Sequence, residues 1–193
     1  MRELRTNALS MNHIPPAYAP PPDDGLTVHY ADADLLVVDK PAGLLSVPGR
    51  GPGMDDNLAS RVQARFPEAL TVHRLDMDTS GLLILTNDTS FADFITSPIS
   101  HVPKTYLVKS SSRLTDEQLD SLRKGLNLED GPTRPAAVTR LRDSEKYTHF
   151  EITITEGRNR QVRRMVEAVG SKVLKLVRVS IGPISLAGLT IGA

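Results

Sequence analysis

The chain has 193 residues, no cysteine, 39% hydrophobic residues and a formal net charge of zero at pH 7. This size suits one domain, or one domain with an appendage, and the hydrophobic content is sufficient for a sizeable core. The lack of cysteine excludes disulfides and cysteine-ligated zinc or iron–sulfur sites, and no run reaches the ~18 apolar residues of a membrane span. Residues 1–10 lack the apolar stretch of a secretory signal, so we expect a cytoplasmic protein.

The first 24 residues are expected to form a proline-rich, flexible tail ahead of one folded domain at residues 25–193. Prolines gather between positions 15 and 22, and the segment has almost no apolar periodicity. Such a composition is typical of extended chain rather than of a packed element.

The first half of the folded domain reads as strands, a loop and a helix. Strands are predicted at Leu26–Tyr30 and Asp34–Lys40, and the glycine- and proline-rich segment Ser46–Gly53 is predicted to be a loop. Apolar residues recur every four positions in Asn57–Phe66, which indicates a helix with one buried face. The short apolar run Leu82–Leu85 indicates a buried strand.

A strand and a well-marked helix follow. Lys104–Ser110 alternates polar and apolar residues as a strand does. Thr115 and Gln118 have the spacing of a capping box, so a helix is predicted over Asp116–Lys124, with Gly125 ending it.

The last third of the chain completes the pattern of an α+β protein. We predict a strand at Thr148–Thr155, a helix at Arg160–Val169 and a final strand at Lys172–Ile181. Strands do not alternate regularly with helices, so a doubly wound parallel sheet is not expected. A mixed, largely antiparallel central sheet with a few packed helices fits better.

The charges are unevenly distributed although they sum to zero. Segregated charge can create a phosphate-binding face on a neutral protein, and a solvated helix face is the plainer alternative. Basic residues dominate one stretch, where only Glu156 and Glu167 are acidic. These basic residues are Arg158, Arg160, Arg163, Arg164, Lys172, Lys175 and Arg178.

The segment 72–88, VHRLDMDTSGLLILTND, places Asp76 and Asp78 in a turn just before a predicted buried strand. By composition alone this is an ordinary turn whose Asp and Ser side chains cap backbone groups. A metal site formed by His73, Asp76 and Asp78 is a weaker alternative, because no further ligands accompany it.

Four short segments have the composition of known sequence motifs. They are Lys40-Pro41-Ala42-Gly43, His73-Arg74-Leu75-Asp76 with Thr79-Ser80-Gly81, Lys104-Thr105-Tyr106, and Gly157 to Met165. Together they resemble the RluA/RsuA superfamily of pseudouridine synthases. They match its motifs in order and span about Asp34 to Ile181, so the resemblance is specific. Segments through Gly81 are similar to the RluA branch, whereas those from about Leu85 onward are similar to the RsuA branch.

The resemblance implies an isomerase that converts specific uridines to pseudouridine in structured RNA, without a cofactor or a metal. It implies that Asp76 acts on the sugar and that Arg163 is the cation beside it. Tyr106 would stack on the flipped uracil, and Arg74 would fill the space that the base vacates or hold a phosphate. Among RNA substrates it favours ribosomal RNA, the large subunit first, and leaves tRNA open.

The remaining expected roles are to line the pocket and to bind RNA. Leu75 and Val162 are expected to form apolar walls. A monomer is the simplest expectation, and no membrane partner is expected. A catalytically silent RNA-binding protein and a sugar glycosidase remain as alternative functions. The expected RNA contacts beyond Arg74 are Arg50, Arg158, Arg160, Arg164 and Lys172.

Overall fold

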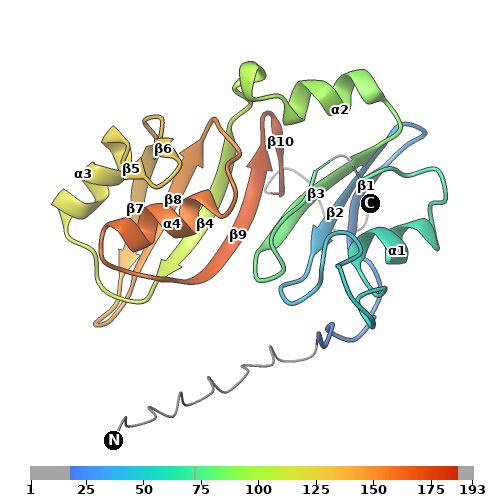
Figure 1. Ribbon diagram of the computed structural model, residues 1–193, viewed down its shortest axis with the longest axis horizontal. Coiled ribbons are helices and arrows are strands. Elements are labelled where there is room, and N and C mark those ends of the chain that lie inside the picture. Colours follow the sequence, from blue (N-terminus) through green and yellow to red (C-terminus); the bar gives the residue numbers. More distant parts are fainter. Residues whose placement is uncertain (1–17, 72, 187–193) are drawn as a thin grey trace, which may run out of the picture.

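The computed structural model describes residues 18–71 and 73–186, and most of its strands join one mixed sheet (Figure 1). The strand order is β1-β2-β3-β9-β4-β8-β7, and β10 pairs with β9 outside this path. The strands of this sheet are β1 (Val28–Ala31), β2 (Leu35–Lys40), β3 (Ser80–Thr86), β4 (Lys104–Ser110), β7 (Ala137–Asp143), β8 (Thr148–Ile154), β9 (Val173–Ile181) and β10 (Ile184–Ser185).

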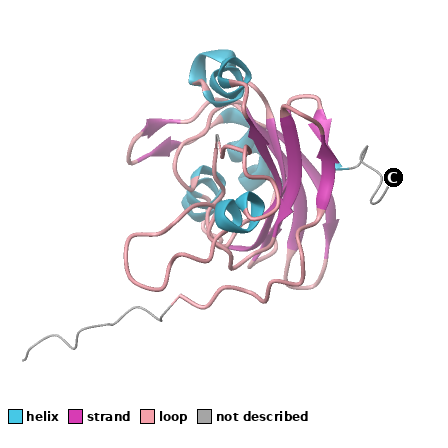
Figure 2. Ribbon diagram, turned by 90° about the vertical axis from the view of Figure 1, so that its right-hand side faces the viewer, coloured by secondary structure: helices cyan, strands magenta, loops and turns pink. Residues whose placement is uncertain are grey.

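The helices are short, and they gather mainly on one side of the sheet when it is seen edge-on (Figure 2). None of them, within the described ranges, is long and apolar enough to cross a bilayer. A hairpin of two residues per strand stands apart from the main sheet. The remaining elements are α1 (Leu58–Gln63), α2 (Thr89–Thr96), the 3-10 turn η1 (Pro98–Ser100), α3 (Asp116–Lys124), α4 (Gln161–Ala168), β5 (Asn127–Leu128) and β6 (Gly131–Pro132).

The sheet is largely antiparallel, as expected. The exception is the pairing of β3 with β9, which joins the half formed by β1, β2 and β3 to the half formed by β9, β4, β8 and β7. Strand β3 pairs with β9 in parallel, through Ser80 with Val177 and Gly81 with Arg178. Gly81 has φ +108°, and a Cβ there would overlap the backbone of Arg178. Only glycine allows this close approach, so the Thr-Ser-Gly sequence serves the junction between the two halves.

Two apolar clusters lie on opposite faces of the sheet, which explains why β3 reads as a continuous apolar run. Leu83 and Leu85 pack in the larger cluster with residues of α1, α3 and α4. Leu82 and Ile84 pack in the smaller cluster, which includes Ile95 of α2. Successive residues of a strand point to opposite faces, so a strand buried on both faces needs apolar residues throughout.

The helix ends follow the local sequence. The capping box of α3 is present: the Thr115 hydroxyl accepts from the Gln118 amide, and the Gln118 side chain accepts from the Thr115 amide. Gly125 then ends the helix, as predicted. Helix α4 begins differently, because Arg160 precedes it with a left-handed φ of 47° and no side-chain cap.

The expected strands and helices are found with end shifts of a few residues. The sequence pattern did not predict α2, β7 or the short elements η1, β5, β6 and β10. Helix α2 follows Asp88, whose carboxylate accepts from the amides of Ser90 and Phe91. Strand β7 closes one edge of the sheet. Each buries a single side chain fully, Ile95 in α2 and Val138 in β7, so neither shows a strong apolar pattern.

Residues 18–24, the later part of the expected proline-rich tail, form no helix or strand but contact the folded domain. The Tyr18 hydroxyl donates to the Asp56 carbonyl at 2.8 Å and accepts from the Leu45 amide at 3.0 Å. The guanidinium of Arg61 donates to the Pro21 carbonyl at 2.7 Å. Residues 1–17 lie outside the described residues, and the domain boundary at residue 25 stays a prediction.

Candidate active site

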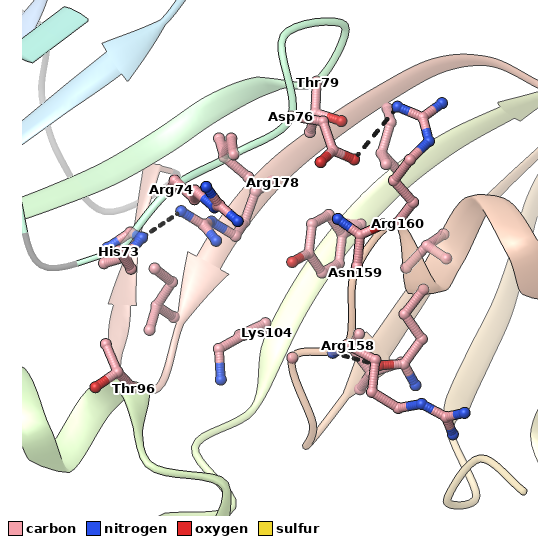
Figure 3. A pocket seen from close by; sticks show the side chains of 18 of the residues that line it. His73, Arg74, Asp76, Thr79, Thr96, Lys104, Arg158, Asn159, Arg160 and Arg178 are labelled. Carbon is pink, nitrogen blue, oxygen red and sulfur yellow. Dashed lines mark hydrogen bonds and ion pairs between the residues drawn. The ribbon is translucent and has the colours of Figure 1, made fainter. Parts of the chain in front are cut away.

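An open cavity of about 520 Å³ lies beside the junction of the two half-sheets. It is lined by the turn before β3, by β4 and β9, by the end of α2 and by the loop that leads into α4 (Figure 3). The segments brought together are the ones that carry the sequence motifs. Seven of the expected site residues line it: Arg74, Leu75, Asp76, Tyr106, Arg158, Arg160 and Val162.

The turn that carries Asp76 is fixed by hydrogen bonds to four consecutive carbonyl oxygens. The Ser46 hydroxyl donates to the Leu75 carbonyl at 2.8 Å and accepts from the Leu75 amide at 3.0 Å. The Asp76 carbonyl accepts from the Thr79 amide at 3.0 Å. The Met77 carbonyl accepts from the Gly43 amide at 2.8 Å. A backbone held in this way presents the Asp76 side chain in one orientation, which favours catalysis by preorganisation.

Lys40 completes this support from beneath the turn. Its ammonium is fully buried and donates to the carbonyl oxygens of Leu44 at 2.6 Å, Pro41 at 2.9 Å and Met77 at 3.2 Å. Burial lowers the pKa of Lys40 to about 8, although the nearby carboxylates of Asp78 and Asp76 oppose the shift. The sequence marked Lys40 as part of a motif, but the local pattern did not reveal this role.

Asp76 is partly exposed to the cavity, with 28% of its side chain accessible, and it faces Arg160. The Arg160 guanidinium lies 3.7 Å from the Asp76 carboxylate and contacts the Asp78 carboxylate through both terminal nitrogens, at 3.2 and 3.3 Å. Burial of Asp78 opposes ionisation, but the hydrogen bond from Arg160 and the charge of Arg163 outweigh it and lower the pKa of Asp78.

Arg163 supports the turn rather than the Asp76 carboxylate, which differs from the expected pairing. Its guanidinium is buried and donates to the Asp78 carbonyl at 3.0 Å and to the Thr79 hydroxyl at 3.3 Å. Its ion pair is with the Asp78 carboxylate, at 3.3 Å. Asp78 therefore links both arginines to the turn, and among the described residues Arg160 is the cation within ion-pair distance of Asp76.

Tyr106 and Arg178 stand opposite each other on neighbouring strands and both line the cavity. Directly opposed residues of an antiparallel pair place their side chains on the same face of the sheet. Arg178 is 3% exposed, and its Nε donates to the Leu82 carbonyl at 2.9 Å. In the sequence, Arg178 stands out only as one of the residues of the basic stretch.

His73 and Lys104 flank Arg178 in the cavity wall. His73 accepts from the Ile84 amide at 3.1 Å and lies 3.0 Å from the Arg178 guanidinium. Burial, followed by the charges of Arg178 and Lys104, lowers the pKa of His73 well below its usual range. The ring is therefore neutral and structural, and the described residues contain no cluster of three metal-ligating side chains.

Two of the expected RNA-binding arginines are held by an acid of the small hairpin. Arg158 and Arg164 both pair with the carboxylate of Asp130, which follows β5, and the Arg164 contacts are 2.8 and 3.0 Å. These hydrogen bonds hold the pKa of Asp130 well below its usual range. Arg158 also lines the cavity, so the hairpin helps to shape its rim.

The remaining expected contacts fall outside the cavity lining. Arg50 lies exposed in the glycine-rich loop and Lys172 lies exposed after α4. Leu75 and Val162 are buried and line the cavity, and their role as apolar walls stays a prediction.

Comparisons with known proteins identify the family of the chain. Residues 34–168 match the family described as RNA pseudouridylate synthase. The chain is 39% identical over 174 residues to ribosomal large subunit pseudouridine synthase B of Bacillus subtilis, covering 88% of this chain and 70% of that protein. It is 40% identical over 178 residues to ribosomal large subunit pseudouridine synthase E of Xanthomonas campestris pv. campestris, covering 82% and 92%.

A solved structure of a pseudouridylate synthase has the same fold. It superposes with a TM-score of 0.71 at 32% identity and covers 83% of this chain and 68% of the other. The chain therefore belongs to the RNA pseudouridylate synthase family. It is an RNA pseudouridine synthase, an isomerase whose substrate is RNA.

Proposed function

We propose that the protein converts a specific uridine of large-subunit ribosomal RNA to pseudouridine, with Asp76 as the group that acts on the sugar. One observation carries the role of Asp76: its carboxylate is open to the cavity, while the turn that bears it is held by hydrogen bonds at each of four carbonyls. Two relatives at 39% and 40% identity bear the name ribosomal large subunit pseudouridine synthase, which supports the choice of RNA.

The chemistry requires that the bond between uracil N1 and ribose C1′ break and that uracil C5 then bond to C1′. The ionised carboxylate of Asp76 serves either as the nucleophile at the sugar or as the counter-charge to a cationic sugar. Arg160 lies 3.7 Å from the Asp76 carboxylate, which is also open to the cavity where the substrate would bind. Arg163 keeps the turn in place through Asp78 and Thr79.

The target base must leave its stack before Asp76 can reach the sugar. Tyr106 offers an aromatic face in the cavity, and such a face contributes roughly 1–3 kcal/mol per stacked base. Arg74 is exposed at the cavity and is suited to fill the vacated space or to hold a phosphate. Leu75 and Val162 exclude water from the base.

Basic residues around the cavity would bind the phosphates of the surrounding RNA. Arg158 and Arg164 are within reach of a phosphate if they exchange their carboxylate partner for it, whereas Arg50 and Lys172 are already exposed. A monomer acting in the cytoplasm is the simplest form of this proposal.

The test is release of tritium from RNA transcripts that carry uridine labelled at C5, because the C5 hydrogen is lost when C5 bonds to the sugar. Separate reactions would contain unmodified large-subunit rRNA, small-subunit rRNA and a tRNA pool. We expect release from large-subunit rRNA alone, at one site. Release from tRNA alone would overturn the rRNA assignment, and no release from any RNA would overturn the proposed function.

A further inference from the structure

Arg178 is a buried cation with no acid beside it. Its guanidinium is 3% exposed, and among residues 18–71 and 73–186 no carboxylate lies within ion-pair distance of it. Burial lowers the pKa of Arg178, with Tyr106 opposing the shift, yet a guanidinium stays protonated at any physiological pH. A buried charge without a partner of opposite charge is costly to folding, so its retention calls for a reason.

The bonds of Arg178 to the protein leave donors available on the cavity side. Nε is used by the Leu82 carbonyl at 2.9 Å, one terminal nitrogen lies 3.0 Å from His73, and the guanidinium also interacts with the Tyr106 hydroxyl. A guanidinium has five N–H donors, and the residue lines the cavity opposite Tyr106. Figure 3 shows its planar group in the cavity wall near His73, away from Arg160.

The cavity carries opposite charges at its two ends. At one end Asp76 is the exposed acid. At the other end lie Arg178 and Lys104, whose pKa is lowered by burial and then by the charge of Arg178. A uridine whose sugar meets Asp76 and whose base stacks on Tyr106 would direct the carbonyl oxygens of its base toward Arg178.

We propose that Arg178 is a catalytic residue that donates hydrogen bonds to the carbonyl oxygens of uracil and stabilises the negative charge which the base carries when it leaves the sugar. This inference rests on the proposed function of the same cavity. A guanidinium fork is well suited to planar acceptors, and a fixed cation where charge develops is an efficient form of catalysis.

The step balances without a further reagent. The electron pair of the C1′–N1 bond leaves with uracil, whose anion spreads its charge over N1 and the two carbonyl oxygens. Arg178 remains protonated throughout and only donates hydrogen bonds. C5 then forms the bond to the cationic C1′, which gives a neutral adduct. Loss of the C5 proton to water and gain of a proton at N1 from water restore the conjugated ring, so the step has no net proton change.

The test compares uridine with 5-fluorouridine at the target position. Fluorine withdraws electrons and stabilises the uracil anion, so the fluorinated base depends less on an external cation. We would measure loss of the starting nucleoside in single-turnover reactions with excess enzyme, by digestion and mass spectrometry. We expect Arg178→Met to slow the reaction of uridine by about 10²–10³-fold and that of 5-fluorouridine by at least tenfold less.

Arg123→Met is the matched control. The Nε of Arg123 also donates to a backbone carbonyl, that of Val138 at 2.9 Å, but Arg123 is not part of the cavity lining. We expect wild-type rates on both bases. Thermal unfolding of both variants would show that each is folded at the assay temperature.

Each outcome bears on a different claim. Equal slowing of both bases by Arg178→Met would overturn the inference alone, because a structural role affects both reactions alike. If Arg178→Met does not fold, Arg178→Gln keeps a donor for the Leu82 carbonyl and is used in the same comparison. Failure of both neutral variants to fold would assign the cation to structure and overturn the inference. No reaction by the wild type on any RNA would overturn the proposed function itself.

Discussion

The Lys40 ammonium lies 3.2 Å from the carbonyl oxygen of Met77, the residue between Asp76 and Asp78. The same carbonyl accepts from the Gly43 amide at 2.8 Å. The segment Lys40–Gly43 thus reaches the turn of the proposed catalytic carboxylate from below and ties it to the end of β2. Two motifs far apart in the sequence form one structural unit through this contact.

The lowered pKa of Lys40 predicts how stability changes with pH. Between the folded pKa of about 8 and the ordinary value of 10.5, the unfolded state binds more protons than the folded state, so stability rises with pH. Relative to Lys40→Met, the wild type should gain up to about 3 kcal/mol of unfolding free energy over this range. Urea unfolding of both proteins from pH 7 to pH 10.5 checks this. A difference that stays flat or falls would contradict it.

Arg163 is predicted to matter more for stability than its neighbour Arg164. Arg163→Met leaves the Asp78 carbonyl and the Thr79 hydroxyl without their donor and should lower the unfolding free energy by roughly 1–3 kcal/mol. Arg164→Met removes only contacts with the exposed Asp130 and should cost less than about 1 kcal/mol. Equal losses in denaturant unfolding would show that Arg163 does not support the turn.

Asp130 competes with RNA for two arginines if Arg158 and Arg164 contact phosphates. Asp130→Asn should then tighten RNA binding several-fold and make the dependence of log K on log salt steeper, since more phosphates are neutralised. Glu129→Gln removes the same charge from a neighbouring exposed residue and controls for general repulsion. Weaker binding by Asp130→Asn than by Glu129→Gln would indicate that Asp130 positions the two arginines instead.

Gly81 is predicted to be required for the junction of the half-sheets. Gly81→Ala places a Cβ against the Arg178 backbone and should cost on the order of 3 kcal/mol. Gly25→Ala is the control, because Gly25 has a similar φ of +98° but open space around the added atom, and about 1 kcal/mol is expected. Similar losses for both in thermal unfolding would mean that backbone strain, not the contact, decides the effect.

Local chemistry made much of the fold predictable. The capping box at Thr115 fixed the start of α3, and alternating residues marked β4 and β8. Helix α2 was missed because it buries only Ile95 fully and leaves Phe94 57% exposed. Edge strand β7 was missed because only Val138 of its side chains is buried.

The site was predictable only where a motif marked it. Asp76, Tyr106, Leu75 and Val162, which the motifs marked, all line the cavity, and the roles that the resemblance implies for them stay predictions. Arg178 was not anticipated because its place depends on strand register. The pairing of β4 with β9 shifts between Thr105 and Tyr106, and this irregularity brings Arg178 opposite Tyr106. A one-residue slip of that kind has no signature in the local sequence.

The partners of the acids also required the structure. Asp76 and Asp78 are two residues apart with equal chemistry, and Arg160 and Arg163 are both basic residues at the start of α4. Only the left-handed φ of Arg160 directs its side chain to both carboxylates, while Arg163 reaches the turn from within the helix.

The most direct test of the central claim compares Asp76→Asn with Asp78→Asn in tritium release from C5-labelled large-subunit rRNA. The role assigned to the Asp76 carboxylate predicts no detectable release by Asp76→Asn and reduced but measurable release by Asp78→Asn, which keeps the Asp78 carbonyl bonded to Arg163. Circular dichroism and RNA binding would establish that both variants are folded. Release by Asp76→Asn at the wild-type rate, or its loss only in Asp78→Asn, would contradict the assignment of Asp76.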